Sequence, residues 1–371
     1  KPGAVSSQES LPETEIAPGV KARLYWGKGA LVARITLAPG AEIPREAIPS
    51  ERFMVVMKGS VDQLSGGQMV SMKAVEYERM TPISGRREQN DFIYLEKNAE
   101  SAVTAGPEGA EILEVYSPVR LDWLQKAGAE NIPSNVPDPD FGIAPTHTPG
   151  VVYNLHDVQF TELVPGAISR LISGRAVQLS FIRMDPGSFF PHHNHPEEQL
   201  MVVLRGSTEE IILDGVSPME KGSILCLPGG MVHGGTNSPL GCDALDVFWP
   251  VRPDYEEKRQ AQLEKFHAVI PEDAKIELVA DGAVQSPKLI YCEGPSWVNR
   301  KLYFSSMGYD DRWNGDVPAS ALVEMDPDGT YRFISRGIEY NGTFPLANGR
   351  MAVCDMYGHR VVEVDTKGKI T

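Results

Sequence analysis

Three histidines and one glutamine between Gly187 and Asn237 constrain this chain more than any other feature of its sequence. His193 and His195 are separated by one residue, so on a regular strand both imidazoles leave the same face. Gln199 follows four residues later, and His233 comes from a separate segment. Three imidazoles and an amide oxygen meeting at one point suit a divalent metal that keeps open coordination positions. The stretch therefore predicts a metal site.

The spacing around these residues resembles the two sequence motifs of the cupin family. The first motif is matched without a gap by Gly187, His193, His195, Gln199 and Gly206, and the second by Gly222, Pro228, Gly230, His233 and Asn237. The commoner cupin pattern has glutamate where this chain has Gln199, and glutamine resembles a subset that includes the small cupins of pectin and uronate breakdown. The resemblance implies a barrel with one divalent transition metal, and zinc, nickel, manganese and iron are not distinguished.

The predicted ligands are all neutral, so a bound metal keeps its double positive charge and acts as a strong Lewis acid toward anionic substrates. Redox chemistry with dioxygen stays open, although the usual iron set of two histidines and one carboxylate is not seen here. His192, Glu197 and Glu198 are expected to face solvent or to support the ligands. The general base is not identified, because Glu209 and Glu210 are both candidates and surface exposure is the expectation for each.

The first half of the chain is a copy of the second. The segment Val20–Gly40 resembles Ala167–Gly187, and Leu113–Arg120 resembles Leu245–Arg252. Both copies contain short alternating apolar runs with Gly and Pro turns, which is typical of strands in barrels or sandwiches. The sequence therefore predicts an all-β chain with two tandem jelly-roll barrels, the arrangement that resemblance to a bicupin also implies.

The first copy has lost the ligand set. At the positions of the four predicted ligands it has Glu46, Ile48, Arg52 and Ala102. The interpretation that we favour is a structural or dimerising barrel, in which Glu46 and Arg52 pair across the old site. A substrate pocket built on Arg52, and a homodimer through the barrels, stay open as alternatives.

Composition divides the chain into four parts. Residues 1–130 are the degenerate barrel, with a polar, loose leader up to Pro18. Residues 131–150, rich in Pro, Asp, Asn and Gly, are a linker. Residues 151–268 are the metal-binding barrel, ending in a helix over Arg252–His267. Residues 269–371 form a region of their own.

This last region resembles the opening blades of the gluconolactonase and senescence-marker propellers. The resemblance rests on three motifs in order: E-G-P (Glu293–Pro295), D-P-D-G (Asp326–Gly329) and N-G-T-F (Asn341–Phe344). It implies that Glu293 is a metal ligand, for calcium or another divalent ion in a completed propeller, and that Asn341 lies in a substrate pocket. The family's later ligands have no counterpart, so we expect about two blades and an incomplete site.

Charge and composition limit the partners. The formal net charge of −15 disfavours nucleic acid and anionic membranes, and no apolar run reaches the length of a membrane span. The four cysteines show no metal-binding or redox spacing. The chain begins with Lys1 instead of Met, which we read as processing that slightly favours an exported protein.

Three function classes follow. The favoured class is a metal-dependent enzyme that isomerises, hydrates or ring-opens a sugar acid or sugar lactone, with an anionic carbohydrate as its small-molecule substrate. The second is a bicupin dioxygenase, which consumption of oxygen would reveal. The third is a sugar-binding bicupin without turnover.

Overall fold

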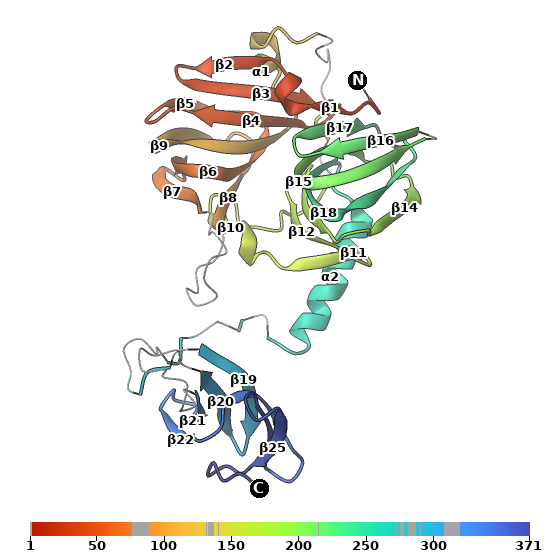
Figure 1. Ribbon diagram of the computed structural model, residues 1–371. Coiled ribbons are helices and arrows are strands. Elements are labelled where there is room, and N and C mark those ends of the chain that lie inside the picture. The colour runs from red at the N-terminus through yellow and green to blue at the C-terminus, as the bar shows by residue number, and fades with distance from the viewer. Residues whose placement is uncertain are drawn as a thin grey trace. The chain divides into compact units, whose positions relative to one another are not determined.

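The computed structural model describes residues 2–75, 89–130, 132, 137–139, 141–213, 215–271, 273–274, 278–280, 287–289, 291–307 and 320–371. The chain forms two compact units, Lys1–Ile270 and Pro271–Thr371. The first unit contains two nine-stranded sheets, each curled into a barrel (Figure 1).

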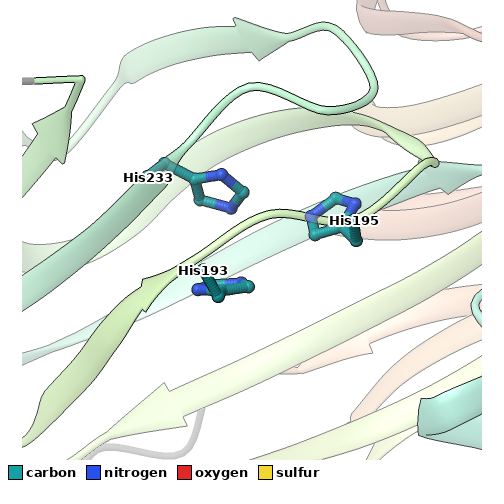
Figure 2. A group of neighbouring side chains, drawn as sticks. All are labelled: His193, His195 and His233. Atoms are coloured by element: carbon teal, nitrogen blue, oxygen red, sulfur yellow. The ribbon is translucent and has the colours of Figure 1, made fainter.

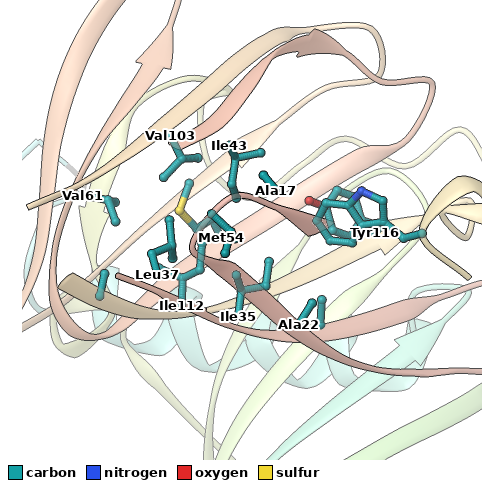
Figure 3. Close-up of a cluster of buried hydrophobic side chains, with 14 of the residues drawn as sticks. Ala17, Ala22, Ile35, Leu37, Ile43, Met54, Val61, Val103, Ile112 and Tyr116 are labelled. Atoms are coloured by element: carbon teal, nitrogen blue, oxygen red, sulfur yellow. The ribbon is translucent and has the colours of Figure 1, made fainter. Parts of the chain in front are cut away.

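The first barrel holds most of the first copy. Its strands are β2 (Glu13–Ala17), β3 (Val20–Trp26), β4 (Leu31–Leu37), β5 (Glu42–Ala47), β6 (Glu51–Ser65), β7 (Gln68–Val75), β8 (Gln89–Leu95), β9 (Glu100–Ser117) and β10 (Val152–Asn154). They lie in the order β10-β8-β7-β6-β9-β4-β3-β2, with β5 also paired to β9. Apolar side chains such as Ile35, Met54 and Ile112 fill the interior (Figure 3), so the first barrel is a packed core.

The second barrel repeats this plan. Its strands are β1 (Ser6–Ser7), β11 (Phe160–Val164), β12 (Ala167–Ser173), β13 (Gln178–Met184), β14 (Phe189–His193), β15 (Glu198–Ile212), β16 (Gly215–Glu220), β17 (Ser223–Leu227) and β18 (His233–Trp249). They lie in the order β1-β17-β15-β18-β13-β12-β11, with β14 on β18 and β16 on β15. The expected all-β, cupin-like jelly-roll architecture is therefore confirmed for this unit.

The two barrels exchange short strands. β1, from the start of the chain, pairs with β17 of the second barrel, where Ser6 lies opposite Ile224. β10, which follows the first barrel in sequence, returns to pair with β8. The prediction of a loose leader before Pro18 was wrong, because β1, the 3-10 helix η1 (Gln8–Ser10) and β2 are all held in place. Polar composition hid this role, since a strand at a sheet edge needs backbone groups more than apolar side chains.

The interface between the barrels explains the apolar runs without alternation. In β6, Met54 faces the interior of its barrel and Phe53 faces the second barrel. In β15, Met201 faces the interior and Leu200 faces the first barrel. Strands covered on both faces lose the usual polar alternation.

Two carboxylates lock this interface from opposite sides. Glu51, on β6, accepts backbone N–H bonds of 2.8–2.9 Å from residues 175–177 of the second barrel. Glu198, at the same place on β15, accepts bonds of 2.5 and 3.2 Å from Lys28 and Gly29 of the first. Gly27 leaves room for Glu198, since a Cβ at residue 27 would lie 2.2 Å from the carboxyl carbon and would displace it. The repeat seen in the sequence is therefore a pseudo-twofold relation in space.

The helices are few. α1 (Leu121–Lys126) follows the first barrel, the 3-10 helix η2 (Leu155–Asp157) follows β10, and α2 (Pro253–His267) follows the second barrel close to the predicted bounds. Among the residues that the structure describes, none of the helices is long and apolar enough to cross a membrane.

The second unit consists of two small antiparallel sheets. One has four strands in chain order, β19 (Tyr291–Val298), β20 (Lys301–Met307), β21 (Ser320–Met325) and β22 (Tyr331–Ser335). The other has three, β23 (Tyr340–Pro345), β24 (Met351–Asp355) and β25 (Arg360–Val364). Meanders of this size suit propeller blades, but the described part of the unit contains no closed ring of sheets.

Candidate metal centre

The three histidines of the sequence motif come together at one end of the second barrel (Figure 2). His193 is the last residue of β14 and pairs with His233, the first residue of β18, while His195 lies in the turn before β15. Each offers one ligand atom, and these atoms lie within 4.8 Å of one another. His195 and His233 are buried and His193 is partly buried. The fold therefore brings together the three imidazoles that the spacing predicted.

Neighbouring oxygens fix the orientation of the rings. The Nδ1 atoms of His193 and His233 lie 2.9 Å from the carbonyl oxygens of Pro191 and Met231. A carbonyl can only accept, so each Nδ1 carries the proton and each Nε2 keeps its lone pair. The Nδ1 of His195 lies 3.4 Å from a carboxylate oxygen of Glu197. The hydrogen bonds behind the rings of His193 and His233 are of the kind that orients metal-bound histidines, whereas Nδ1 of His195 lies near Glu197 without a hydrogen bond.

Burial keeps the imidazoles neutral. It lowers the pKa of His195 and of His233 to about 4, and it lowers that of His193 as well. The cationic Arg252 nearby acts in the same direction on all three pKa values. Neutral imidazoles are the form that coordinates a metal, so at neutral pH the cluster is ready to bind one.

Gln199 points its carbonyl oxygen toward the cluster. Its Oε1 lies 3.3 Å from Nε2 of His195, and its Nε2 donates a 2.9 Å hydrogen bond to Asp246. That bond fixes the amide so that oxygen, the atom able to ligate a metal, faces the imidazoles. The donor set fits a divalent transition ion with neutral ligands.

A small cavity of about 40 Å³ lies beside the cluster, inside the barrel. Its wall includes His193, His233, Glu210, Asp246, Arg252 and Tyr255. Burial raises the pKa of Glu210 to about 8, with the Asp246 carboxylate adding to the rise. Burial also raises the pKa of Asp246 to about 6. The cavity therefore carries an acidic group that is mostly protonated at neutral pH.

The residues around the motif differ from expectation in part. His192 is exposed, but Glu197 and Glu198 are buried, the first against His195 and the second at the interface between the barrels. Glu209 is exposed as expected, whereas the expected exposure of Glu210 was wrong. Irregular pairing of β15 near Gly206 shifts the alternation by one residue and turns Glu210 inward.

Arg52 fills the counterpart of the site in the first barrel. Its Nη2 donates to Gln63 at 3.0 Å and to Ser101 at 2.5 Å, and its Nη1 lies 3.4 Å from a carboxylate oxygen of Glu114. Ile48, at the place of His195, belongs to the apolar core. This interior is closed by a buried ion pair.

Two details of the predicted degenerate site were wrong. Ser101 and not Ala102 stands opposite Glu46, as His233 stands opposite His193. Arg52 pairs with Leu95 as Gln199 pairs with Leu227, and Ser101 and His233 each follow that partner by six residues. Glu46 forms an ion pair with Arg120 instead of Arg52. Arg52 reaches the deeper Glu114, which is fully buried and lies on the strand opposite.

Glu293 and Asn341 lie on β19 and β23, the first strands of the two sheets in the second unit. Asn341 accepts a hydrogen bond from Gly342 N and donates a 3.4 Å contact to Met307 Sδ. Within the described residues, the grouping of three or more potential metal-binding His, Cys, Asp and Glu side chains is found at the histidine cluster and not around Glu293. Their roles in metal and substrate binding stay predictions.

Comparison with known proteins supports the assignment of the second barrel. The family model for the cupin domain matches residues 180–247. No match was found among curated proteins. Similar solved structures include AerE from Microcystis aeruginosa (15% identity, 65% of this chain and 98% of that chain, TM-score 0.47) and a formate complex of oxalate decarboxylase from Lactobacillus farciminis (14%, 73% and 94%, 0.48).

A cupin 2 conserved barrel domain protein from Leptotrichia buccalis is also similar (13% identity, 67% of this chain and 97% of that chain, TM-score 0.44). Similarities this distant transfer no activity to this chain. The second barrel thus carries a cupin domain with a three-histidine cluster, and the first barrel repeats its strand order in a bicupin-like arrangement.

Proposed function

We propose that the second barrel is a metal-dependent enzyme that acts on a sugar acid or sugar lactone. The observation that carries the proposal is the cluster of three buried or partly buried neutral imidazoles with the Gln199 oxygen beside them. All four ligands are uncharged, so the site favours an anionic substrate that chelates the ion. The glutamine in the ligand set, which resembles uronate-metabolism cupins, supports the sugar-acid class.

The side chains of the cavity have separate roles in this proposal. His193, His195, His233 and Gln199 hold one divalent ion, which when bound supplies a Lewis acid for carboxylate, hydroxyl or carbonyl oxygens. Glu210 is the proton donor in this proposal, because it lines the same cavity as two of the histidines and burial raises its pKa to about 8 in the metal-free chain.

We further propose that the second unit contributes propeller-type blades to a carbohydrate-directed protein. The four-stranded meander β19–β22 and the ordered E-G-P, D-P-D-G and N-G-T-F motifs support this. The close approach of β19 and β23 also supports it, since Gly294 leaves no room for a Cβ beside Gly342. The sequence predicts an incomplete lactonase site in this unit, and lactonase activity of the chain that Glu293→Ala abolishes would contradict that prediction.

Elemental analysis followed by turnover assays tests the main proposal. We expect one transition metal per chain, its loss in the His193→Ala, His195→Ala double variant, and its retention in the control His192→Ala, which changes an exposed neighbour. Unsaturated uronates and sugar lactones are the substrates to assay. Unchanged metal content in the double variant would contradict the site, and metal-dependent consumption of oxygen would favour the dioxygenase class instead.

A further inference from the structure

Two arginines occupy matching places in the two barrels. Arg120 and Arg252 each come three residues after a long strand, β9 or β18, and are 4% and 5% exposed. Each guanidinium donates through Nε and Nη2 to the aspartate two residues later, Asp122 at 2.8 and 2.6 Å and Asp254 at 3.0 and 2.6 Å. Each also lies over an aromatic ring three residues later, Trp123 at 4.5 Å or Tyr255 at 3.8 Å. The barrels therefore hold the two guanidinium groups in the same way.

The arginine of the first barrel has one additional partner. Arg120 binds both carboxylate oxygens of Glu46, through Nη1 at 2.9 Å and Nη2 at 3.3 Å. Glu46 stands at the place that His193 takes in the second barrel, since Glu46 pairs with Ser101 as His193 pairs with His233. The first barrel thus shows what this arginine binds at the mouth of the site: a carboxylate held by two hydrogen bonds.

The second barrel has no carboxylate at the place of Glu46, although the buried Glu197 carboxylate is near enough to help raise the pKa of Arg252. With His193 at the corresponding place, the hydrogen bonds and ion pair found for Arg252 in the described part of the chain all go to Asp254. Arg252 also lines the cavity that His193 and His233 line. A cavity of about 40 Å³ has room for a small polar group beside the guanidinium.

We propose that Arg252 anchors a carboxylate group of the substrate beside the three histidines. Glu46 in the first barrel is then the built-in counterpart of that carboxylate. The inference rests on the proposed function and narrows it, because it requires a free carboxylate in the substrate. It favours an open sugar acid or uronate over a neutral lactone.

Glycolate, a small hydroxy acid, and glycolamide, its uncharged analogue, are suitable probes for calorimetric titration of the full chain. Loss of a charge-assisted hydrogen-bond pair predicts that Arg252→Gln weakens glycolate binding by about tenfold or more and leaves glycolamide binding unchanged. The control is Arg120→Gln, which removes the matching contacts in the first barrel together with the Glu46 pair and should leave glycolate binding as in the wild type. Equal glycolate affinity in Arg252→Gln and wild type, or no measurable binding by the wild type, would overturn the inference.

Measuring the metal content of the wild-type chain distinguishes a failure of the proposed function from a failure of this inference. A wild-type chain without transition metal contradicts the metal enzyme, whereas the dependence of glycolate binding on Arg252 tests the anchor in either case. If Arg252→Gln does not fold, glycolate binding by Arg252→Lys is measured instead. Lysine keeps the charge but loses the two-pronged geometry, so weaker glycolate binding is expected and wild-type affinity would overturn the anchor.

Discussion

Replacing Glu210 by glutamine should stabilise the metal-free protein in alkaline solution. Glu210 is 8% exposed, and burial together with the Asp246 carboxylate raises its pKa from 4.5 to about 8. Its folded-state pKa lies above the unfolded one, so this carboxyl contributes most at low pH and its contribution is lost as pH rises through about 8. Glutamine has no ionisable proton, so the variant escapes that loss. The first barrel shows that the fold accepts the change, because Gln63 occupies the same strand position.

The magnitude follows from the size of the shift. A rise from 4.5 to about 8 corresponds to at most about 5 kcal/mol against ionisation of the folded form. Relaxation and entry of water reduce such values. We therefore expect the free energy of unfolding of Glu210→Gln, relative to that of the wild type, to rise by about 2 kcal/mol from about pH 5 to about pH 9. Bound metal should shrink the gain, since a nearby cation stabilises the ionised carboxylate.

Urea unfolding of wild type and Glu210→Gln at the two pH values, with and without a chelator, measures this difference. Glu209→Gln is the matched control, because the adjacent side chain is exposed and should give no pH-dependent difference. A stability difference between wild type and Glu210→Gln that is the same at both pH values would refute the reasoning, since it would mean that Glu210 titrates normally in the folded chain.

Two further predictions concern the ligand set and the interface. Gln199→Glu should retain metal but weaken binding of an anionic substrate, because it adds a negative charge beside the ion; metal analysis and substrate titration check this, and equal substrate affinity would contradict it. Glu51→Ala should destabilise the first unit by about 3 kcal/mol, because it leaves three backbone N–H groups at the interface without their acceptor. Chemical denaturation measures the loss, and an unchanged midpoint would show that water replaces the carboxylate.

The repeat and the spacing of the ligands were enough to predict the barrels and the histidine cluster. Both depend on local periodicity and on turns with fixed lengths, which a sequence displays directly. The helix α2 was also predictable, because its charged run follows an apolar strand and begins with Pro253. Features of this kind need no knowledge of distant partners.

The inward direction of Glu210 and the exchange of strands were not predictable in this way. Simple alternation from Gln199 would turn Glu210 outward, and only the irregular pairing near Gly206 reverses it. β1 and β10 are short and partly polar, and their positions depend on the edges of sheets formed by residues far away in sequence. That Ser101 and not Ala102 takes the place of His233 is likewise visible only in the strand register.

The interiors of the two barrels differ around the position of the predicted metal site. Arg52 touches Ser101, Gln63 and Glu114, which occupy the places of His233, Glu210 and Asp246. The guanidinium of Arg52 therefore lies among the first-barrel counterparts of the residues that surround the proposed metal position in the second barrel. Both interiors bury an acidic side chain, and a buried carboxylate needs a cation or a proton nearby.

In the first barrel the side chain of Arg52 provides the cation and closes the site, and Arg120 forms an ion pair with Glu46. The second barrel has no such guanidinium at Gln199, and its Arg252 binds no side chain at the place of Glu46. An exchangeable ion and a substrate carboxylate are the two groups that would complete the same charge pattern there. The proposed metal and the proposed anchor therefore follow from two differences between the copies, Gln199 in place of Arg52 and His193 in place of Glu46.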